Sequence, residues 1–568
     1  MKKFISLLLA ALLLFTAAVP ALAESAAEND PVVIVPGLME SILVTDRGTP
    51  QEARFFENVS DVAKANLLKL VLGAMLALFF GKYDVLVDAA SAVSDATMRK
   101  LAMTPDGTSV YPLTPYAIEA ADCTLEAVKA SGAWEHMDYG AQHAEALAEQ
   151  LGADRVFIFD YDWRLGSDDL AERLHGFIAD VKTLTGSEKV DVYANSYGCQ
   201  VVAQYLYAYG GEEDFDNLVF NCPAFAGTTL FTDLLSATEK NLDIDFKSGT
   251  SFMLRLFRFE LDLENIVWLL PDRIVRHVVY PLISDVTLKY LRSAPGLWCC
   301  CPVEDYETMK ALLLDPEANA AVIEQCDAIH DGVMSHIRET LDTARAAGID
   351  VSIVAGAGTQ LMSGNRVDGD ATVDTVHATG GVAAPLGKTL PENPDSLHRS
   401  PYGTLDVTGG YLPDNTWVVQ GMAHGQSAWD KETQQLILKL LMTDDLTDVW
   451  ADPLFPQFTD AHSPKDGVSL FFPGTGASVL NASGGEIKAT VRNNSEKNDV
   501  VITEIRIFPG RYLAVGAAGR LAPGEERTFT LVPVRPLRNE QTAKVTVCFA
   551  ETGAIQPLKS RTVFCAVL

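Results

Sequence analysis

The chain has 568 residues, of which 48% are hydrophobic, and its 44 lysines and arginines stand against 75 aspartates and glutamates, a net charge of −31. A chain of this length is expected to form about two to four domains with sizeable cores. Its negative surface would repel phosphate groups, so we expect no nucleic-acid partner and no electrostatic docking on anionic lipid.

The N-terminus has the pattern of an export signal. Two lysines at 2–3 precede an apolar run over 4–19, and the small residues Ala21 and Ala23 supply a cleavage site. This arrangement is typical of a secretory signal peptide. We therefore predict a signal peptide over 1–23, a mature chain that begins at Glu24, and a secreted or extracytoplasmic location, with the cell surface included.

The nine cysteines have no spacing typical of a metal site, and Cys299, Cys300 and Cys301 are adjacent. A large core does not need disulfides, so we expect most of these side chains to be buried or free thiols. We expect neither a metal nor an organic cofactor.

Up to about residue 440, short β-branched runs alternate with segments of helical periodicity. The runs lack polar alternation, which is typical of strands buried on both faces. Candidate strands span 31–37, 155–162, 189–195, 217–223, 350–356 and 416–421. This alternation predicts an α/β domain with a mostly parallel sheet over 24–450.

Two long helical and apolar intervals, near 40–125 and 228–345, interrupt this pattern and are expected to form caps over the active edge of the sheet. The apolar run at 70–81 is too short to span a bilayer. It is either a buried helix or a surface helix that meets lipid. We predict that 66–81 and 251–285 border the substrate pocket.

The C-terminal part differs in character. Residues 451–467 form a proline-bearing segment that we interpret as a linker. Over 468–568, five or more short alternating strands are separated by turn residues, which predicts an immunoglobulin-like β-sandwich. This domain holds no cluster of catalytic side chains, so we expect a spacer or attachment module that contacts the cell surface.

Ser196 lies in ANSYG (194–198), between a predicted strand and a predicted helix. The stretch is either an ordinary turn or a nucleophile elbow, in which a sharp turn presents a serine at the carboxyl end of a strand. A serine hydroxyl needs a base, and α/β hydrolases carry serine, acid and histidine in that order. His424 follows the last predicted strand and fits, whereas His377 is too close to the acid segment and His462 lies in the linker.

The acid should follow the strand at 350–356, where Asp368, Asp370 and Asp374 compete and geometry separates them only partly. Alternating aspartates and glycines also suggest a calcium loop, but the terminal glutamate of that pattern is absent. The oxyanion hole needs two backbone N–H groups.

One of these N–H groups would come from Tyr197, which directly follows the serine. The other would come from Leu38, after Gly37 has let the backbone approach closely.

Together these motifs resemble the lecithin:cholesterol acyltransferase family of α/β hydrolases, which includes phospholipases. The resemblance covers roughly 30–440. The matching segments are VIVPG (33–37), YDWR (161–164), ANSYG (194–198), APGLWCCCP (294–302), DGDATV (368–373) and GMAHG (421–425).

The resemblance implies an α/β-hydrolase fold with large caps and a triad of Ser196, Asp370 and His424. It places the acid at the second aspartate of DGDATV. It also implies that Trp163, Arg164 and Gly198 support the site rather than react. Asn195 stands where many of these enzymes have histidine.

We therefore expect a secreted serine hydrolase or O-acyltransferase that cleaves or transfers the fatty acyl groups of lipid esters, at a membrane or micelle surface. Water and an alcohol are both open as the acyl acceptor. Two alternatives stay open: a non-catalytic lipid- or glycan-binding cell-surface protein, and a small-ester esterase or serine peptidase on the same fold.

Overall fold

The structure is a computed structural model. It describes residues 30–41, 43–49, 52–54, 59–136, 141–236, 271–363, 365–428, 430–461, 467–472, 479–480, 485–495, 497–508, 512–534, 542–551 and 559–567. The predicted signal peptide (1–23), His462 and the first part of the predicted pocket segment 251–285 lie outside these residues.

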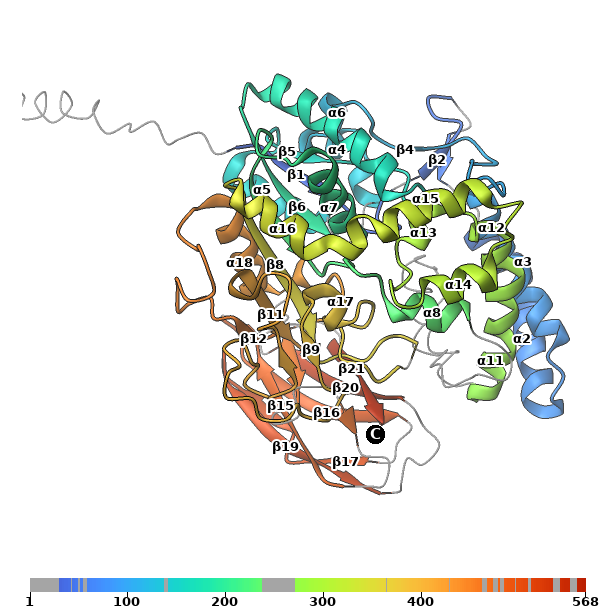
Figure 1. Ribbon diagram of the computed structural model, residues 1–568. Coiled ribbons are helices and arrows are strands. Elements are labelled where there is room, and N and C mark those ends of the chain that lie inside the picture. Colours follow the sequence, from blue (N-terminus) through green and yellow to red (C-terminus); the bar gives the residue numbers. More distant parts are fainter. Residues whose placement is uncertain are drawn as a thin grey trace, which may run out of the picture.

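A seven-stranded sheet with the order β12-β11-β8-β7-β6-β1-β5 forms the centre of the first part of the chain (Figure 1). Every neighbouring pair in it is parallel. Its strands are β1 (Val32–Val35), β5 (Val156–Ile158), β6 (Val190–Asn195), β7 (Phe215–Asn221), β8 (Asp350–Ala357), β11 (Thr416–Gln420) and β12 (Phe458–Asp460). The prediction of an α/β fold with a parallel sheet is confirmed.

Helices cover both faces of this sheet. In β1, Val33 and Val35 pack into one core, while Val32 and Ile34 pack into another, as the two-residue period of a strand requires. The first core is covered by α6 (Ser167–Thr185), α7 (Tyr197–Tyr209) and α16 (Ile337–Ala346). The second is covered by α4 (Leu125–Ala130), α5 (Ala141–Leu151) and α18 (Lys431–Met442). Burial on both faces explains why these strands are largely apolar.

The edge strand β12 comes from the segment interpreted as a linker, 451–467. It pairs with β11, with Phe458 beside Val418. Two small sheets lie outside the main one: β2 (Leu43–Thr45) with β3 (Ala53–Arg54) and β4 (Leu113–Pro115), and β9 (Val382–Ala383) with β10 (Leu405–Asp406). The main sheet therefore extends beyond residue 450.

The described parts of the two predicted cap intervals are mainly helical. The first holds α2 (Val59–Phe80) and α3 (Asp84–Met98). The second holds α8 (Thr229–Leu235), α11 (Asp272–Pro281), η4 (Leu282–Thr287), α12 (Leu288–Leu291), α13 (Pro295–Trp298), α14 (Tyr306–Leu313) and α15 (Ala320–Asp331). Figure 1 shows α2, α3 and α11 together to one side of the sheet, and α11 and η4 both contact α3.

Helix α2 has a buried face and an exposed face, although both are apolar. Gly73 and Ala77 are buried, and a Cβ at Gly73 would lie 2.6 Å from the backbone N of Leu86 in α3. Seven large apolar side chains on the helix are exposed: Leu68, Val71, Leu72, Met75, Leu78, Phe79 and Phe80. The segment 70–81 is therefore part of a surface helix. Within the described chain, no helix combines the length and apolarity needed to cross a bilayer.

The C-terminal part forms two further sheets around one apolar core. Their orders are β13-β15-β19-β17 and β14-β21-β20-β16-β18, and all pairs are antiparallel except β14 with β21. The strands are β13 (Val468–Phe471), β14 (Val479–Leu480), β15 (Ile487–Asn493), β16 (Val500–Phe508), β17 (Tyr512–Val515), β18 (Gly519–Leu521), β19 (Glu526–Pro533), β20 (Thr542–Glu551) and β21 (Lys559–Val567). The prediction of a separate β domain is confirmed, and its immunoglobulin type stays a prediction. All nine cysteines of the chain are buried, unpaired thiols.

Candidate active site

The predicted site residues follow the carboxyl ends of neighbouring strands of the main sheet. Leu38 comes after β1 and Ser196 after β6, while Asp370 and His424 follow β8 and β11. In the sheet, β7 separates the serine strand from the acid strand. Because carboxyl ends of parallel strands meet at one edge, these four residues share the edge at which such sheets place their chemistry.

Ser196 has a strained backbone. Its φ of 54° and ψ of −118° are unusual for a residue with a side chain, and such conformations cost about 1–3 kcal/mol. The Ser196 N–H donates to the carbonyl of Asn221 at 3.0 Å, which ties the turn to β7. Helix α7 begins at the next residue. This is the sharp strand-to-helix turn that a nucleophile elbow requires.

Glycine allows the first loop to press against this turn. A Cβ at Gly198 would lie 2.3 Å from the carbonyl oxygen of Val35 and 2.5 Å from that of Pro36. A Cβ at Gly37 would lie 2.9 Å from the Cβ of Ser196. The loop after β1 and the elbow therefore approach each other more closely than any other residue types would permit.

We expect Gly198→Ala to damage both stability and any activity of this edge. The added methyl group meets two backbone carbonyls, which cannot rotate away, so the elbow must move relative to the loop. Overpacking of this kind costs about 1–3 kcal/mol. Ester turnover and the unfolding temperature should both fall, whereas Gly176→Ala inside α6, where a Cβ would meet open space, should keep its turnover and unfold at the same or a slightly higher temperature, because alanine is the better helix former. Equal behaviour of the two variants would contradict the close approach.

The two predicted oxyanion donors are available in this arrangement. Among the described residues, neither the backbone N–H of Leu38 nor that of Tyr197 donates a hydrogen bond to any group. Tyr197 holds the first position of α7, where helix N–H groups have no partner within the helix. Both N–H groups therefore remain free to bind an oxygen atom.

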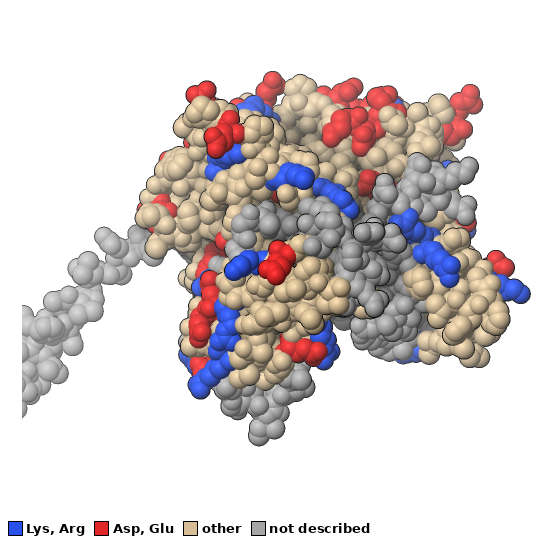
Figure 2. All heavy atoms as spheres, turned by 90° about the horizontal axis from the view of Figure 1, so that it is seen from below, with Lys and Arg blue, Asp and Glu red and all other residues tan. Residues whose placement is uncertain are grey.

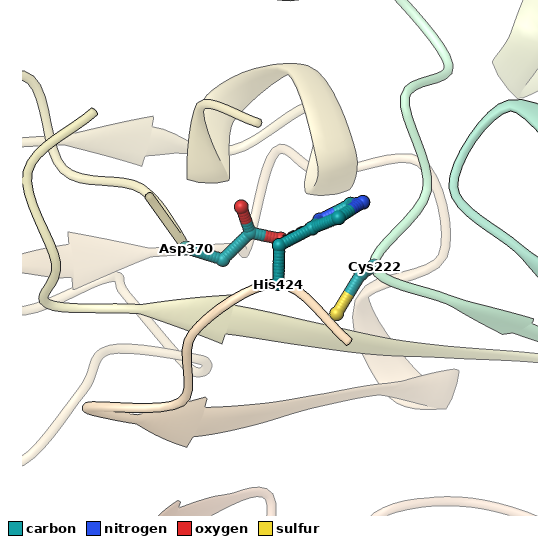
Figure 3. A group of neighbouring side chains, drawn as sticks. All are labelled: Cys222, Asp370 and His424. Carbon is teal, nitrogen blue, oxygen red and sulfur yellow. Dashed lines mark hydrogen bonds and ion pairs between the residues drawn. The ribbon is translucent and has the colours of Figure 1, made fainter. Parts of the chain in front are cut away.

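Asp370 and His424 form a hydrogen-bonded pair. The Nδ1 of His424 lies 2.7 Å from the Oδ2 of Asp370 (Figure 3), and the His424 backbone N–H donates to the Asp370 carbonyl at 2.6 Å. The other carboxylate oxygen of Asp370 accepts from the N–H groups of Thr372 at 3.0 Å and Val373 at 2.7 Å. The carboxylate is thus fixed at both oxygens, and it orients the histidine ring.

The pKa of His424 is raised above its ordinary value. Burial alone would lower this pKa, but the charge of Asp370, the hydrogen bond to it and the charge of Glu40 act in the opposite direction.

The third group in Figure 3 is Cys222, whose sulfur lies within 4.8 Å of a carboxylate oxygen of Asp370 and of a ring nitrogen of His424. Burial and the nearby Asp370 raise the pKa of this thiol well above its usual range. The thiol is therefore a neutral neighbour of the pair.

The turn at Ser196 is linked to this pair through the end of β7, because Asn221 accepts from the Ser196 N–H and the next residue, Cys222, lies beside Asp370 and His424. Within the described residues, the Ser196 hydroxyl makes no hydrogen bond. In proteins without a bound substrate, hydrogen bonds between nucleophile and base are often long and tighten only on binding.

The other two aspartates of the acid segment have different partners. Asp368 is buried and accepts from the Gly358 N–H at 3.0 Å and the Thr375 hydroxyl at 2.8 Å. Burial raises the pKa of Asp368 to about 6. Asp374 lies at the start of α17 (Thr375–Thr379) and accepts from Thr229 at the start of α8. Neither residue has a hydrogen bond to His424.

His377 takes part in a separate ion-pair cluster. Its Nε2 lies 2.9 Å from Glu304, and its Nδ1 lies 3.3 Å from Asp374. Although burial opposes it, these two carboxylates raise the pKa of His377 to about 9. His377 therefore ties the acid segment to the cap, and it is not the partner of Asp370.

Trp163 and Arg164 are fully buried. Arg164 pairs with both carboxylate oxygens of Asp162, at 2.9 and 2.7 Å. The Arg164 carbonyl accepts from the N–H of Gly296, at which a Cβ would lie 2.1 Å from the Trp163 carbonyl oxygen. The YDWR segment thus packs directly on the segment 294–302, below the elbow.

Three further residues contact this site and were not predicted from the sequence. Cys222 and Asn221 lie at the end of β7, the strand between the serine and acid strands. Glu40 lies in the loop after β1 and accepts from the Gly37 N–H at 2.5 Å. One signal pointed to Asn221 and Cys222, because they end a predicted strand next to the serine strand. For Glu40, the only feature of the sequence that placed it near the site was its position in the loop after β1, three residues after Gly37.

No family model and no curated protein matches the sequence. Solved structures give weak overlaps. One is a lipase of Bacillus licheniformis, BlEst2, in its propeptide form, with 10% identity, coverage of 94% of this chain and 93% of the other, and a TM-score of 0.29. Another is the Tle4–Tli4 complex, with 12% identity, coverage of 74% and 99%, and a TM-score of 0.28. Both TM-scores are below 0.5, so neither similarity tells how this chain works.

Proposed function

We propose that the chain is a serine ester hydrolase or O-acyltransferase that acts on lipid esters. Ser196 attacks the ester carbonyl, and His424 accepts its proton. Asp370 holds the ring and stabilises the imidazolium, while the N–H groups of Leu38 and Tyr197 bind the oxyanion. The alcohol leaves with the proton from His424, and an acyl-serine remains. Water or an alcohol then takes the acyl group by the reverse sequence of proton transfers.

One observation carries this proposal. A serine with a strained positive φ stands at the end of β6, and an Asp370–His424 pair with a distance of 2.7 Å stands at the same sheet edge. Proteins retain such strain where function needs it, because it costs stability. A non-catalytic binding protein would need neither the strained serine nor the oriented histidine. The resemblance to the lecithin:cholesterol acyltransferase family, seen in the sequence motifs, favours the same chemistry.

The preference for a lipid substrate is tested by acyl-chain length. Nitrophenyl esters from acetate to palmitate should show a kcat/KM that rises with chain length, because each buried methylene contributes about 0.8 kcal/mol. The kcat/KM for each ester is measured at ester concentrations below the onset of micelle formation. Rates that stay flat from acetate to palmitate would favour the small-ester esterase instead.

The exposed face of α2 supports contact with a lipid surface. Leu68 is 79% exposed and Phe79 is 68% exposed. In Figure 2, the surface on the side where α2 and α3 lie is mostly uncharged, with a few charged side chains at its margin. Lys69 and Lys82 flank the apolar run, and Asp61 is the only acidic residue of the helix. This composition sets α2 apart from the acidic chain as a whole.

We expect the double substitution Leu68→Ser and Phe79→Ser to reduce turnover of phosphatidylcholine vesicles about tenfold, because two apolar side chains no longer enter the lipid surface. Hydrolysis of soluble nitrophenyl acetate should be unchanged. Leu454→Ser, at a position 81% exposed outside the cap, is the matched control and should leave both rates as they are. A vesicle rate that matches the wild type in the double variant would argue against this docking face.

We also propose export of the protein, which rests on the two lysines, the apolar run and the small residues at the N-terminus. The mass of the protein recovered from outside the cytoplasm should correspond to a chain that begins at Glu24. A chain that retains residues 1–23 would contradict it.

A further inference from the structure

A chain of hydrogen-bonded polar side chains connects the three loops of the candidate site. Glu40, in the loop after β1, accepts from the side-chain amide of Asn195 at 2.8 Å. The Asn195 Oδ1 accepts from the Nδ2 of Asn221 at 2.7 Å. The same Nδ2 lies 2.9 Å from the hydroxyl oxygen of Ser427, three residues after His424. The contacts thus run from the oxyanion loop through the elbow to the histidine loop.

Each member of this chain is next to a group that the proposed reaction uses. Glu40 also accepts from the Gly37 N–H at 2.5 Å, which shapes the turn that presents Leu38. Asn195 immediately precedes Ser196. Asn221 holds the Ser196 N–H through its own carbonyl.

The network is buried where it crosses the sheet. Asn195, Asn221 and Ser427 are at most 1% exposed, and His143, 2% exposed, closes the chain 3.2 Å from the Ser427 hydroxyl. Burial holds the pKa of His143 near 3, so its ring is neutral. Where water is excluded, a lost partner leaves a buried polar group unsatisfied, so we expect the loss of one contact to weaken its neighbours.

On the proposed function, the relative placement of these three loops decides the rate. A displacement of about 1 Å between nucleophile, base and oxyanion donors is worth about 100-fold in rate. We propose that Glu40 is a positioning residue, which, through Asn195, Asn221 and Ser427, holds the oxyanion loop, the serine elbow and the histidine loop in one fixed arrangement. The inference rests on the proposed function and names a residue on which its geometry depends.

Glu40 also acts on His424 through its charge. Within the described part of the chain, three titratable groups from three different segments face this histidine: Asp370 in the acid segment, Cys222 after β7, and Glu40 after β1. The thiol is neutral and carries no charge that would shift the pKa of His424. The two carboxylates are charged, and both raise this pKa. His424 serves as a base only when it is neutral. Removing the charge of Glu40 should therefore move the acidic limb of the kcat/KM profile to lower pH.

The test is a charge-swap cycle of Glu40→Gln, Asn195→Asp and the double variant. In Glu40→Gln, the carboxamide offers one oxygen for two donors, so one contact is lost. In Asn195→Asp, two carboxylates face each other and repel. In the double variant, the carboxamide at position 40 accepts from Gly37 and donates to the carboxylate at position 195, which still accepts from Asn221. All three hydrogen bonds and the net charge are preserved.

We expect each single variant to lower kcat about 10- to 100-fold on a soluble nitrophenyl ester with little change in KM, since the donors are misplaced and not removed. The double variant should recover most of the loss. Glu40→Gln should move the acidic limb to lower pH, Asn195→Asp should not lower it, and the double variant, which restores a single carboxylate, should return it toward the wild-type position. Glu52→Gln is the matched control, because Glu52 caps the Gly48 N–H at 2.7 Å in the same manner but is exposed. Thermal unfolding of every variant separates misfolding from mispositioning.

The outcomes distinguish the two proposals. If the wild type neither turns over esters nor reacts with a fluorophosphonate, the proposed function itself fails. If the wild type is active and Glu40→Gln keeps both its kcat and its acidic limb, Glu40 is not a positioning residue. A double variant no faster than the slower single variant would equally overturn the network, provided that its unfolding temperature matches that of the wild type.

Discussion

Replacing Ser196 by alanine is expected to lower kcat for ester hydrolysis by roughly 10⁴- to 10⁶-fold, the usual effect of losing a triad nucleophile. The fold should be unaffected. Among the described residues, no group depends on the Ser196 hydroxyl for a hydrogen bond, so its removal leaves no buried donor or acceptor unsatisfied. Alanine also tolerates the φ of 54° about as well as serine does, because both carry a Cβ.

The measurement compares kcat and thermal unfolding of Ser196→Ala with those of Ser352→Ala. Ser352 lies in β8 and is 6% exposed, so it controls for removing a hydroxyl from a buried part of the same sheet. We expect the control to keep its rate. Near-native turnover by Ser196→Ala, with an unchanged unfolding temperature, would show that the turn after β6 is only structural.

Replacing Asp370 by asparagine is expected to cost about 10⁴-fold in kcat. The reason is that Oδ1 of Asp370 accepts hydrogen bonds from two backbone N–H groups, those of Thr372 and Val373. An asparagine would keep its carbonyl oxygen toward these donors and turn its NH₂ group toward His424. The ring would then carry its proton on Nε2, the nitrogen that must accept the proton of Ser196. The base would be present but in the wrong tautomer.

The two neighbouring aspartates supply matched comparisons. Asp368→Asn retains an oxygen for Gly358 and Thr375, and Asp374→Asn alters the contact with Thr229, but neither residue has a hydrogen bond to His424. Both variants should keep their rates within about tenfold of the wild type, an effect of the size expected for indirect changes. An active Asp370→Asn together with an inactive Asp368→Asn would reassign the acid.

The main sheet could be predicted because its strands are buried on both faces. Continuous apolar runs such as that of β1 are too short for helices, and their β-branched residues and their alternation with helical segments identify them as strands. Strand β12 could not be predicted in this way. It has only three residues, Phe458–Asp460, and its pairing with β11 is determined by tertiary contacts.

The position of α2 was left open for a related reason. From Leu70 to Phe80 the helix is apolar on all sides, so this part of the sequence has no periodic pattern that tells a buried face from an exposed one. The small residues Gly73 and Ala77 determine which side packs, since they allow α3 to approach closely. This depends on the partner helix, which a single-sequence pattern does not reveal.

The backbone of the candidate site follows from local motifs, because ANSYG, DGDATV and GMAHG each follow a recognisable strand. The side-chain network does not. Glu40 and Asn195 are 155 positions apart, and Asn221 and Ser427 are 206 positions apart. Contacts over such separations depend on the order of the strands in the sheet, and this order cannot be predicted from the local motifs.

Labelling with a fluorophosphonate followed by peptide mass mapping tests the central claim most directly, because the reagent reacts with a serine that is activated by a base and faces an oxyanion hole. The account predicts a single adduct on the peptide that contains Ser196, formed in the wild type, greatly slowed in Asp370→Asn, and absent in Ser196→Ala. A folded wild-type protein that remains unlabelled, or an adduct on a different serine, would contradict it.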